Sequence, residues 1–432
     1  FYDLVPPDRY FDRHPEYFAL VGGERRRKDA QLCLTNPEVL RIATEAVRQR
    51  IGSRPDACIV SVSQNDCGGW CECVRCGALA EAEESQAGPI LHFVNAIADG
   101  LARDRPEVVV DTLAYRYSLK PPRHVRPRPN VCIRLCSIEC VFNQPIERHP
   151  FNLRFREVMQ EWSKICKRLY VWDYVGNYSH NLLPHPNLYV LKPNIQFYIR
   201  HGAQGVFEEA VYYTRGAELA ELRRYVLAKT LWDPTYDTDR AIEEFCQGYY
   251  GPAAPYVRRY VSLIHASLLE HPGVVLTIHA EPLAGFLSPA LLDEAAALLD
   301  RAEKAVAGDP VLGLRVRLVR LPVIYAMLNF ADAAAWAEVG GRLVPCHRWD
   351  VAGLAREFLA ICKEGEVTRV RESPLAPWAA LQDPAEWLQT VTRWPNEAPV
   401  ERIANPVLEV AVLPAMGGRI WRAVLRTSGR DV

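Results

Sequence analysis

Four apolar, β-branched segments of this chain each lead into an acidic residue. The acids are Asp66, Glu139, Asp173 and Glu208, after segments 58–65, 131–135, 169–172 and 205–207. Continuous apolar strands are typical of parallel sheets that are covered on both faces. In a β/α barrel, the carboxyl ends of such strands meet at one pocket. Carboxyl groups that share a pocket can act as general acid and base, most simply at a glycosidic bond.

Aromatic and polar side chains accompany these acids, and aromatic rings are suited to stacking on sugar faces. We therefore expect a substrate-binding set of Asn65, Trp70, Tyr115, Arg116, Trp172 and Tyr174. Arg116 is suited to bidentate binding of a carboxylate, and a structural ion pair is the alternative. Period-two alternation lets only one of Glu208 and Glu209 face the pocket.

Each acid also has a purely structural interpretation. Asp66 follows Asn65, and such pairs form turns. Glu139 has Arg134 earlier on its strand and would form a buried ion pair with it. Asp173 would be a carboxylate within an ordinary aromatic core. The sequence alone leaves these alternatives open.

A cysteine cluster follows the first of these strands, at Cys67, Cys71, Cys73 and Cys76. Four thiols so close in sequence are suited to structural zinc, but Cys-x-Cys is not the usual Cys-x2-Cys spacing. Disulfides or free thiols are therefore the favoured interpretation. No histidine accompanies the cluster, so we expect neither a catalytic metal nor a cofactor.

Predicted strands and helices alternate around these residues. In chain order they are helix 37–50, strand 58–65, helix 88–103, strand 107–113, strand 130–136, helix 152–167, strand 168–173, helix 192–201 and strand 203–207. This alternation predicts βαβ units and a parallel sheet. Five strands also fit a doubly wound sheet, but no Gly-x-Gly-x-x-Gly motif supports a dinucleotide site. We expect a (β/α)8 TIM-type barrel over 1–235 that is incomplete at its N-terminus.

The remaining chain changes character twice. From about residue 216 the apolar period is helical and predicts an α-helical domain over 236–390. Residues 391–432 alternate instead and predict the first strands of a β-sandwich. The sequence starts at Phe1 and stops inside this last segment, so we expect a fragment of a longer protein without a visible signal peptide.

Composition restricts the class of partner. The 432 residues carry a net charge of −1, which gives no global argument for binding nucleic acid or an anionic membrane. No uninterrupted apolar stretch approaches the ~20 residues that span a bilayer. We expect an oligosaccharide or polysaccharide as the partner, with neither nucleic acid nor a membrane.

Several segments resemble a bacterial family of unassigned function, domain of unknown function 4838. The matching segments are Tyr17–Leu20, Gln31–Pro37, Ser63–Asp66, Cys71–Cys76 and Trp172–Tyr174. The resemblance covers about residues 1–270. Because that family is grouped with TIM-barrel glycosidases, it implies a glycosidase that is secreted or periplasmic.

A more distant resemblance is to the α-glucuronidases of glycoside hydrolase family 67. Gln64–Gly68 corresponds to their Asn-Ser-Glu-Gly, Trp172–Gly176 to their Gln-Glu-Tyr-x-Gly, and Leu231–Pro234 to their Ala-Trp-Asp-Pro. This resemblance implies that Asp66 is the general acid and Asp173 the base, with Glu139 assisting. Both Asp residues stand where that family has Glu.

The sequence therefore predicts a glycoside hydrolase that uses carboxylate catalysis on a uronic-acid or related unit of a plant or bacterial polysaccharide. Glu208 would help to orient the base and to bind hydroxyl groups. The alternative is a non-catalytic carbohydrate-binding protein on a degenerate barrel.

Overall fold

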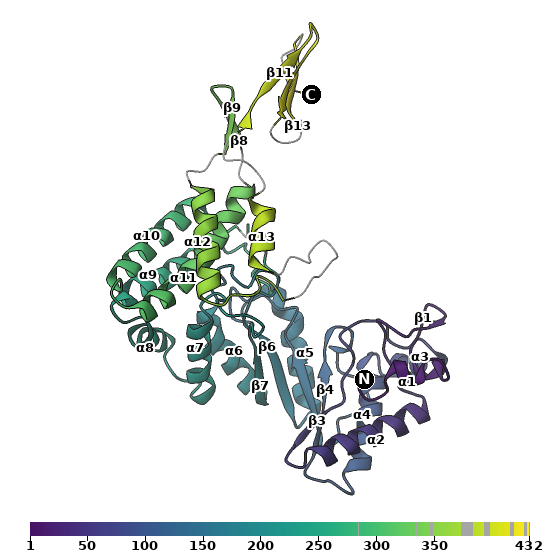
Figure 1. Ribbon diagram of the computed structural model, residues 1–432. Helices are drawn as coiled ribbons and strands as arrows, with labels where there is room; N and C mark the ends of the chain where they lie inside the picture. Colours follow the sequence, from purple (N-terminus) through teal and green to yellow (C-terminus); the bar gives the residue numbers. More distant parts are fainter. Residues whose placement is uncertain are drawn as a thin grey trace. The chain divides into compact units, whose positions relative to one another are not determined.

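The computed structural model describes residues 1–283, 285–333, 336–345, 349–372, 383–392, 398–414, 419–426 and 430–431. The chain divides into two compact units (Figure 1). The first unit consists of Phe1–Val175 and Pro193–Glu209, and the second of Gly176–Lys192 and Ala210–Val432.

The first unit is built on a five-stranded parallel sheet. Its strands are β3 (Ile59–Ser61), β4 (Val109–Ala114), β5 (Val131–Cys136), β6 (Leu169–Tyr174) and β7 (Ala203–Glu209). Each strand pairs with the next one along the chain. Right-handed crossovers in this order place the connecting helices on one face, whereas a doubly wound sheet reverses its order. The predicted parallel sheet is confirmed and has the strand order of a barrel segment, but closure into eight strands is not confirmed within the described residues.

Helices precede β3 and connect the successive strands, except that β4 and β5 are joined by a loop with a 3-10 turn. The helices are α1 (Pro7–Tyr10), α2 (Pro37–Ser53), α3 (Val74–Ala82), α4 (Ala87–Leu101), α5 (Leu153–Ile165) and α6 (Leu188–Arg200), with 3-10 turns at Pro15–Tyr17, Arg116–Ser118 and Pro150–Asn152. α2 starts as the sequence predicts: Asn36 Oδ1 accepts the N–H of Glu38 at 2.9 Å, and Pro37 occupies the first helical position. A short hairpin, β1 (Leu20–Val21) and β2 (Glu24–Arg25), precedes α2.

Alternation along the strands separates the sheet into two faces. One face, here the apolar face, carries Val60, Val110, Val131, Ile133, Val171 and Val206, which the strand registers align. The other, here the polar face, carries Ser61, Asp111, Arg134, Trp172 and Phe207. Tyr198 of α6 reaches Asp173 on the apolar face, which places a connecting helix on that side.

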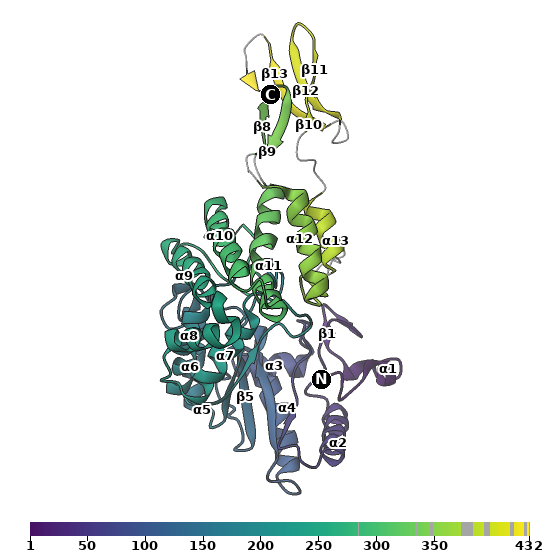
Figure 2. The ribbon, with the colours of Figure 1, turned by 60° about the vertical axis from the view of Figure 1, so that its left-hand side comes forward.

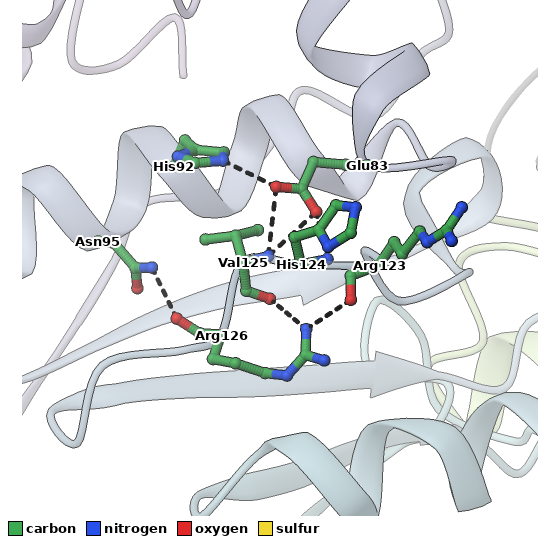
Figure 3. A network of polar contacts seen from close by, with 7 residues as sticks. All are labelled: Glu83, His92, Asn95, Arg123, His124, Val125 and Arg126. Atoms are coloured by element: carbon green, nitrogen blue, oxygen red, sulfur yellow. Dashed lines mark hydrogen bonds and ion pairs between the residues drawn. The ribbon is translucent and has the colours of Figure 1, made fainter.

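A buried carboxylate anchors the Pro-rich loop between β4 and β5 (Figure 3). Glu83, 4% exposed, accepts the backbone N–H groups of His124 and Val125 and lies 3.0 Å from His92 Nε2. Asn95 of α4 donates its amide to the carbonyl of Arg126 in the same loop. Burial opposes ionisation of Glu83, but these partners together lower its pKa.

The second unit is mainly helical (Figure 2). Its helices are α7 (Ala220–Trp232), α8 (Thr238–Tyr250), α9 (Ala254–Glu270), α10 (Pro289–Ala305), α11 (Pro310–Ala333), α12 (Val351–Glu364) and α13 (Pro384–Val391). Successive helices from α7 to α12 pack against one another. None of the described helices combines the length and the apolar composition that crossing a bilayer requires.

Two small antiparallel sheets also belong to this unit. One contains β8 (Trp336–Val339), β9 (Arg342–Pro345) and β10 (Ala398–Pro399); the other contains β11 (Glu401–Ala404), β12 (Leu408–Leu413), β13 (Arg419–Leu425) and β14 (Arg430–Asp431). Strands are therefore present where the sequence changes to alternation near its end. The domain limits at 235 and 390 and the assignment to a β-sandwich stay predictions.

Candidate functional site

Asp66 lies exposed in the loop after β3, beside the carboxyl end of β4. The hydroxyl of Tyr115 donates to its Oδ1 at 2.9 Å. Tyr115 itself is 6% exposed, so its ring is fixed by packing while its hydroxyl orients the carboxylate. The structure thus places a solvent-accessible carboxylate at the strand end where the sequence predicts one.

The loop around Asp66 is held by buried amides. Gln31 donates to the carbonyls of Asn65, Cys67 and Gly68 and accepts the N–H of Asn65. The Asn65 amide donates to the Ala30 carbonyl at 2.8 Å. Because both side chains are occupied in this way, Asn65 positions the loop, and its predicted contact with substrate stays a prediction.

Gly69 sets the position of Trp70 beyond the same loop. Its φ is +66°, and a Cβ at this residue would lie 2.6 Å from the Asp29 carbonyl oxygen, so only glycine fits. Trp70 is 38% exposed, and its ring lies 5.2 Å from that of Tyr117. The ring is therefore accessible for stacking on a flat apolar surface.

Glu209 brings a second carboxylate to the polar face. It is the register partner of Tyr174, and its Oε2 accepts the indole N–H of Trp172 at 2.6 Å. Burial is the main reason that the pKa of Tyr174 is raised, and the charges of Glu209 and Asp66 both add to it. Burial is also the main reason that the pKa of the Cys136 thiol is raised, and the same two carboxylates add to it. Asp66 and Glu209 therefore act on the same two side chains of this face.

An ion pair lies further down the polar face. Arg134 Nη2 is 2.9 Å from Asp111 Oδ2, and the guanidinium lies 5.9 Å from the centre of the Trp172 ring. Burial raises the pKa of Asp111, although Arg134 opposes this shift. Among the described residues, Arg134 therefore pairs with Asp111. The purely structural interpretation of Glu139 expects an ion pair between Glu139 and Arg134, and the structure places Asp111 there instead.

Asp173 and Glu208 lie on the apolar face as register partners on β6 and β7. Asp173 is 2% exposed and accepts hydrogen bonds from Ser137 Oγ, Tyr198 Oη and the Tyr174 N–H. Both carboxylate oxygens of Glu208 are buried and have no hydrogen-bond partner among the described residues. Burial raises the pKa of both groups, and the charge of Asp173 raises that of Glu208 further. The structure brings these two predicted acids together, but on the opposite face from Trp172 and Tyr174.

We expect Glu208→Gln to raise stability at alkaline pH. A carboxyl group whose folded pKa is raised stabilises the fold below its ordinary pKa and loses that contribution as the pH rises through the raised value. Each unit of elevation corresponds to about 1.4 kcal/mol. The variant should therefore melt at a higher temperature than wild type near pH 8 and at nearly the same temperature near pH 4.5. Thermal melts across this range by circular dichroism measure the difference.

Glu83→Gln is the matched control, because Glu83 is a buried carboxylate with a lowered pKa. A lowered pKa stabilises the fold above the ordinary carboxyl value, and this contribution is lost as the pH falls. Glu83→Gln should therefore destabilise the protein near neutral pH. A Glu208→Gln variant that melts below wild type at alkaline pH would contradict the burial argument.

Glu139 lines a pocket at the carboxyl end of β5. The pocket has a volume of about 100 Å³ and is also lined by Arg116, Arg154, Cys136 and Phe151. Arg116 adopts a φ of +50°, and its guanidinium lies 5.1 Å from the centre of the Tyr115 ring. Within the part of the chain that the structure describes, neither Arg116 nor Arg154 forms an ion pair. The pocket therefore presents two guanidinium groups that are available to an anionic ligand.

The predicted cysteine set is only partly brought together. Cys71, Cys73 and Cys76 converge, but the fourth thiol beside them is Cys33. Cys67 instead contacts the Ala30 carbonyl and the Gln31 amide.

Sequence reasoning left the choice between Glu208 and Glu209 open, and it did not single out Arg154. The two-residue period of a strand could have favoured Glu209. Trp172 and Tyr174 share one face and Asp173 lies on the other, and the register places Glu209 beside Tyr174. Arg154 lies in the first turn of α5, and no spacing in the sequence relates it to β4 or β5.

These observations define a mixed α/β protein with acidic, aromatic and basic side chains at the carboxyl ends of a sequentially ordered parallel sheet. The chain belongs to the family described as Domain of unknown function (DUF4838), whose sequence signature matches residues 1–262. The predicted family membership is thereby confirmed.

No curated protein matches the chain in sequence. Among solved structures, the chain is similar to a GH138 enzyme targeting pectin rhamnogalacturonan II, with 11% sequence identity and a TM-score of 0.46. The similarity covers 83% of this chain and 63% of that enzyme, so the chain spans less than two thirds of its length.

Proposed function

We propose that this protein hydrolyses an O-glycosidic bond in a carbohydrate that carries a uronic acid. The observation that supports the proposal is that aromatic donors hold two carboxylates at the carboxyl ends of one parallel sheet: Tyr115 Oη donates to Asp66 Oδ1, and Trp172 Nε1 donates to Glu209 Oε2. Two carboxyl groups flanking one bond are the usual requirement for glycoside hydrolysis.

In this proposal Asp66 donates a proton to the leaving oxygen, since it is exposed and oriented by Tyr115. Glu209 activates water or attacks the anomeric carbon, and the indole N–H of Trp172 positions its carboxylate. Tyr115 and Trp172 are thus positioning residues. The resemblance to α-glucuronidases implies Asp173 as the base instead. Comparing the activities of Glu209→Gln and Asp173→Asn tests both assignments.

The uronic-acid part of the proposal rests on the pocket around Glu139. Arg116 and Arg154 line it without a carboxylate partner among the described residues. A guanidinium binds a carboxylate with two parallel hydrogen bonds, so an anionic sugar suits this pocket better than a neutral one. Trp70 and Phe151, which are 38% and 67% exposed, offer faces for sugar rings.

The test is a screen of aryl uronides against the matching neutral aryl glycosides. We expect release of the aryl group from a uronide at a rate well above that from its neutral counterpart. Equilibrium binding of the same sugars is measured in parallel. Binding without hydrolysis of any substrate would favour the alternative, a carbohydrate-binding protein without catalysis.

A further inference from the structure

Four cysteine thiols from two separate segments of the first unit come together. Cys33 lies between β2 and α2, whereas Cys71, Cys73 and Cys76 lie at and before the start of α3. Their sulfur atoms all lie within 4.8 Å of one another. Cys33 Sγ is 3.7 Å from Cys73 Sγ and 3.9 Å from Cys76 Sγ.

These separations match a tetrahedron of thiolates around one metal ion. Zinc–sulfur bonds are about 2.3 Å long, so the edge of a regular zinc tetrathiolate is about 3.8 Å. Disulfides would instead join the sulfurs in two pairs. Here each sulfur lies near the other three, which is the arrangement that a shared central ion requires.

The surroundings of the cluster also suit a metal tetrathiolate. Cys33, Cys71 and Cys76 are 2%, 7% and 3% exposed, and Ala19 and Ala30 pack against them. The Leu20 N–H lies 3.4 Å and the Arg25 guanidinium 3.8 Å from Cys71 Sγ.

The hydroxyl of Thr35 lies 3.1 Å from Cys76 Sγ. Zinc with four thiolates carries a charge of about −2. The hydrogen-bond donors around the sulfurs and one arginine are the outer partners that stabilise such a charge.

We propose that Cys33, Cys71, Cys73 and Cys76 bind one structural zinc ion. Four protein ligands leave no open position for water or substrate, so the ion has no catalytic role. It ties the segment between β2 and α2 to the start of α3. Gln31 lies two residues before Cys33 and holds the loop at Cys67 and Gly68, so the ion stabilises the segment on which Asp66 stands.

The test compares metal content in purified wild-type protein and two cysteine variants, measured by inductively coupled plasma mass spectrometry. We expect about one zinc per chain in wild type and in Cys67→Ser, and at least about a tenfold loss in Cys33→Ser. Cys67 is the matched control because it belongs to the same sequence run but lies outside the four-sulfur group. Retention of zinc by Cys33→Ser, or its loss in Cys67→Ser, would overturn the assignment.

A second measurement covers the case in which Cys33→Ser does not fold. Wild-type protein exchanged into cobalt should show the visible absorption of a tetrahedral tetrathiolate, and a strong zinc chelator should lower the melting temperature of wild type. Metal-free wild type, iron in place of zinc, or two disulfides found among these four cysteines by mass spectrometry would each contradict the proposal. None of these readouts depends on glycosidase activity.

Discussion

Glu209→Gln and Asp66→Asn are each expected to lower kcat/KM on the best aryl glycoside by about a thousandfold or more, without loss of the folded state. A positioned acid or base contributes about 10²- to 10⁴-fold to such reactions. Both substitutions keep side-chain size, and the amide oxygen of each variant still accepts the hydrogen bond from Trp172 or Tyr115. Initial rates and circular dichroism of the same preparations measure the effect.

Asp173→Asn separates this assignment from the one that the α-glucuronidase resemblance implies. Asp173 is buried and already accepts three hydrogen bonds on the apolar face. If Glu209 is the catalytic carboxylate, Asp173→Asn keeps activity within about tenfold of wild type. If Asp173 is the base, its variant is inactive and Glu209→Gln remains active. Full activity of all three variants would remove the hydrolase mechanism proposed here.

A leaving-group series adds a readout that a structural role would not change. The activity lost in Asp66→Asn should be small for aryl groups with acidic phenols and large for those with basic ones, since only the latter need a proton. Glu209→Gln should reduce the rate for all leaving groups. An equal loss across the series in Asp66→Asn would contradict its role as the proton donor.

The parallel sheet could be predicted because local signals determine it. The strands are short segments rich in apolar and β-branched residues, and each crossover is long enough to hold a helix, so the order of elements indicates βαβ units. The order of the strands in the sheet distinguishes a barrel segment from a doubly wound sheet. This order depends on pairing between strands that are far apart in sequence, so local signals do not determine it. The β1–β2 hairpin lies before the first element that we predicted, helix 37–50. Its Gly22-Gly23 turn, with φ of +59° and +86°, is a recognisable hairpin signal.

The choice of catalytic acids shows where local reasoning fails. Every acid at a strand end looks equivalent in sequence, but neighbouring positions of one strand point to opposite faces. We expected Trp172 and Tyr174 in the same pocket as Asp173. In an extended strand, however, Asp173 points to the opposite face from its two neighbours, so the three side chains cannot share one pocket. Register with β7 then assigns Glu208 to the face of Asp173 and Glu209 to that of Tyr174.

The cysteine cluster shows that spacing in the sequence identifies only part of a site whose members come from distant segments. Cys71, Cys73 and Cys76 are close in sequence, so spacing could bring them together. Cys33 reaches them only through the chain path between the β1–β2 hairpin and α2, which no spacing encodes. Cys67 was the expected fourth member by sequence distance, but its thiol contacts the Ala30 carbonyl and the Gln31 amide instead.

Arg116→Ala and Arg154→Ala are each expected to lower kcat/KM for a uronide by about 10- to 100-fold, which rests on the proposed function. Hydrogen bonds to charged groups contribute about 1.5–3 kcal/mol, and each 1.4 kcal/mol is about tenfold. The matching neutral glycoside has no carboxylate for these arginines to bind, so its kcat/KM should change by less than about threefold. The ratio of the two substrates measured on each variant isolates the charge recognition.

Arg148→Ala is the matched control. Arg148 is an exposed arginine in the segment before α5, six residues from Arg154, and it does not line the pocket. Arg116→Lys tests geometry, because lysine keeps the charge but loses the planar fork that binds both carboxylate oxygens. It should recover part of the uronide activity and leave the neutral substrate unchanged. Equal losses on both substrates in the Arg116 and Arg154 variants would show that these arginines support the pocket without recognising an anionic sugar.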